Sequence, residues 1–235
     1  MQTSKLESKV YEELEKNKLF IFKIKDLCLL LKADKTKAYN IIKALKRKQI
    51  IKKVGKGFYV LNGVSEFSIG QNINYPSYLS FWSALSYYGF SDQTPKKIFF
   101  VTTRYTKEIN SFKFVTLSKK RFFGYKSMEG ITIAEKEKAI IDSLLFPKYS
   151  GGIKEIANSL EKSGKEIDIK KLINYAFKVE SKAVLRRLGF ILEKLNYKKG
   201  LKKMRENIGR GYELLDPSLK RKNNLNKKWL LDVNW

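Results

Sequence analysis

The chain opens with apolar residues at helical spacing, interrupted by two short breaks. A capping box formed by Ser4 and Glu7 precedes a stripe of apolar positions, which predicts a helix over residues 5–17. A brief alternation of apolar and basic residues over 20–24 predicts a short strand or an extended entry. Asp26 then stands before a run of leucines, and because aspartate is a favoured N-cap it predicts a second helix there.

A third helix is expected over residues 35–48, with Asp34 as its N-cap. Its buried stripe follows the i, i+3, i+4, i+7 pattern and consists of Ala38, Ile41, Ile42 and Leu45. The opposite face and its flanks hold the candidate DNA-contacting residues Lys35, Thr36, Lys37, Tyr39, Asn40, Lys43, Lys46 and Arg47. Asparagine suits bidentate contact with adenine and arginine with guanine, whereas lysine binds phosphates.

The next segment predicts a β-hairpin with a basic tip. Strand-like segments over 50–54 and 58–61 flank a Gly-Lys-Gly turn, and Lys53 and Lys56 are the candidate phosphate or minor-groove contacts. Three helices followed by such a hairpin are typical of a winged helix-turn-helix, so we interpret residues 1–62 as a DNA-binding domain. The alternative interpretation of this surface is an ordinary solvated charged face.

The rest of the chain predicts a second domain over residues 75–235, joined to the first by a polar linker over 63–74. An aromatic run over 75–88 predicts a core helix that opens at Pro76, since proline is favoured in a first turn. The strands expected after it are 98–101, 112–117 and 131–134, and the helices are 139–145, 152–163, 168–179 and 181–195. The predicted fold class is therefore a two-domain α/β (α+β) protein, a winged helix-turn-helix followed by a mixed α/β domain.

Two strand-like stretches near the end, 212–215 and 229–233, predict an ordered C-terminal hairpin with a basic loop. Residues 198–235 hold 11 Lys and Arg against 4 Asp and Glu. That loop either helps to bind nucleic acid or contacts a partner, and the sequence does not choose between these roles.

Charge narrows the classes of function. The chain has 49 Lys and Arg against 23 Asp and Glu, a net charge of +26, which favours a polyanionic partner, nucleic acid before membrane. The single cysteine excludes an internal disulfide and fits a reducing compartment. No apolar stretch approaches the roughly 20 residues of a membrane span, and the first residues lack a signal core. We therefore expect a cytoplasmic protein.

Catalytic apparatus is sparse in this sequence. The absence of histidine excludes His-based triads, His general bases and most familiar zinc sites. Glu135, Glu137 and Asp142 could form a carboxylate pair, but the Glu-Lys-Glu-Lys run is also an ordinary salt-bridged helix start. A metal-dependent nuclease places an acid and a (D/E)-x-K element on adjacent strands. The Glu-Lys-Glu-Lys run that follows the strand ending at Ala134 is out of register for that element. We expect no enzymatic activity, no cofactor and no metal.

Several segments resemble the AbiEi-type antitoxins, the transcriptional regulators of type IV toxin–antitoxin (abortive infection) systems. The winged helix-turn-helix pattern is the first, and the others are 75–85, 97–103, 131–142, 185–193, and 215–217 with Trp229 and Asn234. The resemblance covers nearly the whole chain. It implies a repressor that binds inverted repeats in its own operon and counteracts a nucleotidyltransferase-like toxin encoded beside it, without a stable complex. No short motif for antitoxicity residues is matched.

Two alternatives stay open at this point. The first is an RNA-binding protein that uses the basic C-terminal segment. The second is a metal-dependent nuclease with a restriction-endonuclease-like fold.

Overall fold

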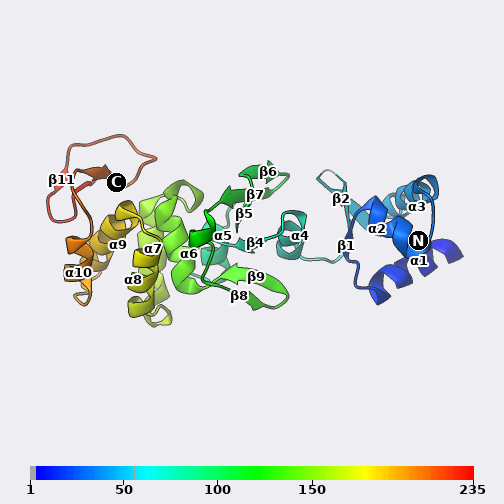
Figure 1. Ribbon diagram of the computed structural model, residues 1–235, viewed down its shortest axis with the longest axis horizontal. Coiled ribbons are helices and arrows are strands. Elements are labelled where there is room, and N and C mark those ends of the chain that lie inside the picture. The colour runs from blue at the N-terminus through cyan, green and yellow to red at the C-terminus, as the bar shows by residue number, and fades with distance from the viewer. Residues whose placement is uncertain (1–3, 56) are drawn as a thin grey trace. The chain divides into compact units, whose positions relative to one another are not determined.

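The computed structural model describes residues 4–55 and 57–235. Helices and several sheets are both present, so the protein belongs to the mixed α+β class that the sequence predicts. The chain divides into two compact units (Figure 1): unit 1 holds Met1–Tyr75 with Glu108–Asn110, and unit 2 holds Pro76–Lys107 with Ser111–Trp235. None of the described helices is both long enough and apolar enough to cross a bilayer.

Unit 1 is a small sheet packed with helices. Its elements are α1 (Lys5–Lys16), β1 (Ile21–Phe22), α2 (Ile24–Leu31), α3 (Lys35–Arg47), β2 (Ile51–Val54), β3 (Phe58–Leu61) and α4 (Glu66–Ile73). β3 is the central strand and pairs antiparallel with both β1 and β2. The first three helices and the β2–β3 hairpin are thus confirmed as elements, with boundaries that differ from the expected ones by at most three residues.

The helix starts of unit 1 are set by side-chain caps. The Ser4 backbone N–H donates to Glu7 Oε2 at 2.7 Å, and Glu7 N–H donates back to Ser4 Oγ at 3.3 Å, which completes the expected capping box. The Asp34 carboxylate accepts a hydrogen bond at 2.8 Å from the Lys37 N–H in the first turn of α3. Asp26 is not the N-cap of α2 as expected. It lies inside the first turn and accepts from Lys23 N–H at 2.7 Å, so the helix begins earlier.

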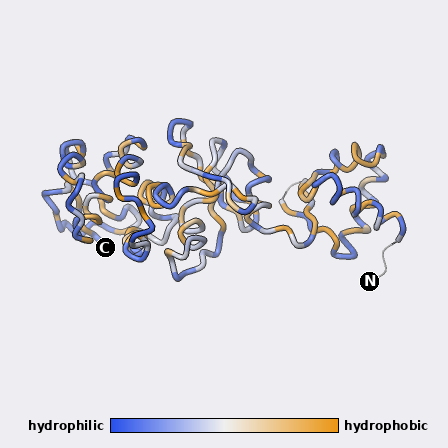
Figure 2. The backbone as a smooth tube through the Cα atoms, turned by 90° about the horizontal axis from the view of Figure 1, so that it is seen from below, coloured by the Kyte–Doolittle hydropathy of each residue, from blue (hydrophilic) through white to orange (hydrophobic). Residues whose placement is uncertain are grey.

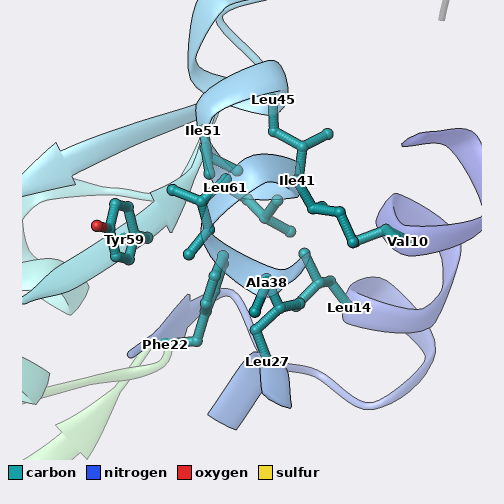
Figure 3. Close-up of a cluster of buried hydrophobic side chains, with 11 residues drawn as sticks. Val10, Leu14, Phe22, Leu27, Ala38, Ile41, Leu45, Ile51, Tyr59 and Leu61 are labelled. Atoms are coloured by element: carbon teal, nitrogen blue, oxygen red, sulfur yellow. The ribbon is translucent and has the colours of Figure 1, made fainter. Parts of the chain in front are cut away.

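The apolar stripes of the three helices meet over the sheet to form the core of unit 1. Figure 3 shows side chains of α1, α2 and α3 converging on those of the three strands. The buried members are Val10, Leu14, Phe22, Leu27, Ala38, Ile41, Ile42, Leu45, Ile51, Tyr59 and Leu61. All four apolar positions expected on the inner side of α3 are buried, which turns the polar side of that helix outward.

The segment expected as a polar linker, 63–74, has regular structure of its own. Most of it is helix α4, whose N-cap Ser65 accepts a hydrogen bond from Ser68 N–H at 3.2 Å. Ile69 and Ile73 are buried. Its polar, glycine-containing composition predicts a linker, and burial of these two isoleucines one turn apart stabilises a helix within it.

Unit 2 is built on a six-stranded mixed sheet in the order β6-β7-β5-β4-β9-β8, of which only Glu108 and Ile109 of β6 are grouped with unit 1. The strands are β4 (Ser77–Leu79), β5 (Ile98–Thr102), β6 (Lys107–Ile109), β7 (Phe112–Thr116), β8 (Tyr125–Met128) and β9 (Ile131–Ala134). β4 pairs antiparallel with β5 and parallel with β9, and β5 pairs parallel with β7. The three expected strands are confirmed as β5, β7 and β9.

The aromatic segment 75–88 is not one helix. Residues 77–79 form strand β4 in the middle of the sheet, and α5 (Phe81–Tyr87) starts only after Ser80. A short, continuously apolar run is compatible with either a buried strand or a buried helix, so its periodicity could not separate the two. Leu79 pairs with Phe100 of β5 and Ile133 of β9, which are both distant in sequence, and this pairing on both sides stabilises the segment as a strand.

The helices of unit 2 gather around α6 (Lys136–Leu145), which packs against α5, α7 (Ile153–Ser163), α8 (Ile169–Lys178) and α9 (Lys182–Lys194). Eight of the ten residues of α6 are buried because it has neighbours on most sides. The four helices expected after the sheet are confirmed as α6 to α9. A further short helix, α10 (Leu201–Glu206), was not expected.

The chain ends in a three-stranded sheet rather than the expected hairpin. β10 (Glu213–Leu214) pairs in parallel with β12 (Leu231–Asp232), and β11 (Leu225–Asn226) pairs antiparallel with β12. Parallel neighbours cannot be joined by a hairpin turn, so the prediction for 212–215 with 229–233 is wrong in strand direction. The loop between β10 and β11 carries basic residues, as expected.

Candidate nucleic-acid interface

The outward side of α3 carries the residues that the sequence singles out. Exposed side chains at this helix are Lys35, Thr36, Lys37, Tyr39, Asn40, Lys43, Lys46 and Arg47. Tyr39 is 56% exposed, although it is an aromatic residue in a helix with a well-buried opposite side. The structure therefore brings all eight candidates of α3 together on one accessible surface, with Thr36, Lys43 and Arg47 near its centre by helical spacing.

Lys48, at the end of α3, contacts another helix instead of facing solvent. Lys48 forms an ion pair with Glu7, the buried capping residue of α1. Its Nζ, together with the Ser4 N–H, holds the pKa of the Glu7 carboxyl below its usual value. This pair links α1 to α3, so it orients the helix whose free side bears the candidate contacts.

Two surface hollows border α3. The first, about 430 Å³, lies between the start of α1 and α3, and Thr36, Lys37 and Asn40 are among its lining residues. The second, about 460 Å³, lies between the end of α3 and β2, and Lys46, Lys52 and Lys53 line part of it. The second hollow is therefore lined by lysines and no carboxylate, whereas the first combines Lys37 with the carboxylates of Glu7 and Asp34.

The β2–β3 hairpin supplies further cations beside α3. Lys52 and Lys53 are both exposed between the buried Ile51 and Val54. Sequence reasoning singled out Lys53 but missed Lys52, because strict strand alternation sends only one of two neighbours outward. The sequence signal that could have indicated Lys52 is its position directly beside Lys53, since two adjacent lysines are rarely buried. Lys56, the other candidate of the hairpin, lies outside the described residues.

Positive charge prevails on the surface formed by α3 and the β2–β3 hairpin. From residue 35 to residue 65 the chain contains no Asp or Glu. Gly55 and Gly57 both have positive φ, +60° and +85°, and this backbone conformation lets the hairpin reverse over a short turn. A helix side and a hairpin, both cationic and free of carboxylates, form a surface suited to a polyanion.

The three carboxylates of unit 2 considered for catalysis occupy two separate environments. Glu135 and Glu137 share Lys171, with N–O distances of 3.2 and 3.3 Å. Burial and the hydrogen bond to Glu135 raise the pKa of the Tyr175 hydroxyl to about 12. Asp142 lies apart, one to two turns further along α6. Residues 4–55 and 57–235 contain no group of three acidic or cysteine side chains placed to hold a metal ion.

Asp142 belongs to a fully buried polar network. It pairs with Lys138 one turn earlier, and both side chains are 0% exposed. Its Oδ2 also accepts from the hydroxyls of Tyr78 at 3.0 Å and Ser80 at 2.8 Å. Lys138 Nζ donates to Tyr78 at 3.0 Å and lies 4.9 Å from the Phe123 ring centroid. Burial lowers the pKa of Lys138, and Asp142 counters that effect.

Comparison with known proteins gives a fold and nothing more specific. No family model and no curated protein sequence matches the chain. Among solved structures, the chain is similar to the crystal structure of the RV2827C protein from Mycobacterium tuberculosis, with a TM-score of 0.71. The match covers 98% of this chain and 92% of that one at 12% sequence identity. At that identity the likeness shows the fold alone.

Proposed function

We propose that unit 1 is a winged helix-turn-helix that binds duplex DNA, with α3 in the major groove and the β2–β3 hairpin as the wing. The observation that carries this proposal is the exposed, carboxylate-free side of α3 with Thr36, Asn40, Lys43 and Arg47. A major groove about 12 Å wide admits one α-helix, and its base edges are read by amide and guanidinium groups. In this arrangement Asn40 and Arg47 read bases, and Lys43 and Lys53 contact phosphates.

The base-reading residues have a distinct signature in binding. We expect Asn40→Ala and Arg47→Ala each to weaken binding to the cognate operator by about 1–3 kcal/mol while sparing non-specific DNA, because only the base contact is lost. Competition between operator and random duplex, followed by fluorescence anisotropy, measures the specificity ratio. Lys9→Ala, at an exposed position of α1, is the matched control and should change neither affinity.

The hairpin lysine should behave differently. Lys53→Ala should weaken operator and random duplex alike and lower the slope of log K against log salt by about 0.9, the value for one phosphate contact on B-DNA. Titrations at several salt concentrations give this slope. If Lys53→Ala and Arg47→Ala change specificity and slope in the same way, the assignment of helix to groove and hairpin to backbone is wrong.

At the level of the cell, we propose a non-enzymatic, cytoplasmic transcriptional repressor that autoregulates its operon and serves as the antitoxin of a type IV pair. The support is the resemblance to AbiEi-type antitoxins, whose segments run through both units. Its functional partner is then a nucleotidyltransferase-like toxin encoded next to it. Co-expression with that neighbouring gene should restore growth, and an Arg47→Ala variant should lose repression of a promoter fusion. Failure of the wild-type chain to restore growth contradicts the antitoxin role and leaves DNA binding intact.

A further inference from the structure

A second cationic surface lies in unit 2, at the end formed by α9, α10 and the small C-terminal sheet (Figure 1). We define the basic end as residues 198–212 and 217–228. Its exposed cations are Lys198, Lys199, Lys202, Lys203, Arg205, Arg210, Lys220, Arg221, Lys222, Lys227 and Lys228. Figure 2 colours much of this end as hydrophilic.

Two of the four acids in residues 198–235 are withdrawn from the surface. Asp216 is 3% exposed, and its carboxylate accepts from the backbone N–H groups of Ile153 at 2.8 Å and Ser218 at 2.9 Å. Asp232 is 1% exposed and accepts from two consecutive backbone N–H groups at 3.0 and 3.1 Å. The other two acids are Glu206, which is exposed, and Glu213, whose side chain is 41% exposed and pairs with the buried Arg186 at 3.3 Å. Because all eleven Lys and Arg of this segment are exposed, the outer surface is more cationic than the sequence count indicates.

The basic end is also held in place, which distinguishes it from a disordered basic arm. The buried Arg186 of α9 donates to the carbonyls of Ile208 at 2.8 Å and Arg210 at 3.0 Å. Arg187 donates to the Leu215 carbonyl at 3.0 Å, and Asn234 bonds Asp216 in both directions, at 2.8 and 2.9 Å. A preformed surface loses little conformational entropy when it binds a ligand.

Exposed apolar side chains lie among these cations. Tyr212 is 39% exposed, Leu219 45% and Leu225 50%. Contacts with duplex phosphates need charge alone, whereas unstacked bases need an aromatic or apolar platform next to the charge. The only regular helix of the basic end, α10, has six residues, less than two turns for entry into a major groove.

We propose that the basic end binds single-stranded RNA, with Tyr212 stacking on a base and the cations of α10 tracking the phosphates. This activity is separate from the duplex binding of unit 1. The combination of a fixed cationic surface, sequestered carboxylates and an exposed tyrosine carries the inference. Duplex DNA and an acidic protein are the competing partners, and the experiment must separate them.

The test uses the full chain with Lys43→Ala, Arg47→Ala and Lys53→Ala, which weakens nucleic-acid binding by unit 1, as the common background for every variant. A short fluorescent single-stranded RNA of mixed sequence is titrated at physiological salt and followed by anisotropy. Lys199→Gln, Lys202→Gln and Arg205→Gln combined should weaken binding by about 10- to 50-fold, as expected for up to three phosphate contacts on a single strand. Tyr212→Ala should weaken it by about fivefold or more, the loss of one stacked base.

The matched control removes the same charge elsewhere on unit 2: Lys154→Gln, Lys165→Gln and Lys170→Gln, all at exposed positions. It should retain RNA affinity within about twofold, since its lysines lie outside the basic end. Equal losses in the two triple variants, or an unchanged affinity in Tyr212→Ala, overturn the proposal. So does competition by duplex DNA or polyglutamate as effective as that by unlabelled RNA. A circular dichroism spectrum shared by all variants shows that folding is not the cause.

Discussion

Asp142→Asn is expected to destabilise unit 2 by about 3–5 kcal/mol, because it leaves the ammonium of Lys138 buried without a counter-ion. Asp142 also accepts hydrogen bonds from the hydroxyls of Tyr78 and Ser80, so the substitution weakens these two hydrogen bonds as well as the ion pair. Urea unfolding followed by circular dichroism measures the loss. The side chains are enclosed by the sheet and α6, so water cannot replace the missing carboxylate.

A matched control lies on the same helix. Lys136 pairs with Glu166 at 2.7 Å, but both side chains are partly exposed, at 30% and 58%. Lys136→Met should therefore cost no more than about 1 kcal/mol. Replacing both buried partners, Lys138→Met with Asp142→Leu, should cost less than the sum of the two single changes because no charge is then stranded. Additive losses contradict the assigned pair.

The stability of Asp142→Asn should also depend on pH in a defined direction. Burial already lowers the pKa of Lys138 in the folded protein, and loss of the carboxylate lowers it further. A lysine with a depressed folded pKa destabilises the fold below that pKa and ceases to do so as the pH approaches its unfolded value of about 10.4. The difference in free energy of unfolding between wild type and Asp142→Asn should therefore become smaller as the pH rises from neutral toward about 10. A constant difference contradicts the prediction.

Gly189→Ala is expected to destabilise the C-terminal region by about 3 kcal/mol or more, at or beyond the upper end of ordinary overpacking. A Cβ at this position of α9 would lie 2.1 Å from Cζ3 of Trp229, which is 0% exposed. Trp229 cannot move away cheaply, since its Nε1 donates to Glu193 at 2.8 Å and its N–H to Asn226 at 2.9 Å. Urea unfolding and proteolysis of the C-terminal segment measure the effect.

The steric explanation of Gly189→Ala can be separated from helix propensity. Alanine is the better helix former, so propensity alone predicts a gain of about 1 kcal/mol. In a Trp229→Leu background the added methyl has no ring to meet, and Gly189→Ala should then be neutral or stabilising. A loss of the same size in both backgrounds rules out the contact with Trp229 as the cause.

Most of the candidate interface in unit 1 was predictable because it depends on local rules. Helical spacing placed all eight α3 candidates on the exposed side, since a stripe of four apolar residues leaves the remaining positions outward. The role of Lys48 was not predictable, because its partner Glu7 lies 41 positions earlier in the chain. Lys52 was missed because two neighbouring residues of β2 are both exposed, against simple alternation.

The sequence by itself determined the helix starts at Ser4 and Asp34, the apolar side of α3, the hairpin after it, and the excess of positive charge. These features depend on residues within a few positions of one another, where capping and periodicity act. Only the tertiary structure decided that 77–79 is a central strand, that Lys138 and Asp142 are buried together, and that β10 runs parallel to β12. Each of these results depends on burial against residues far along the chain, and spacing within a segment does not encode which distant surface covers it.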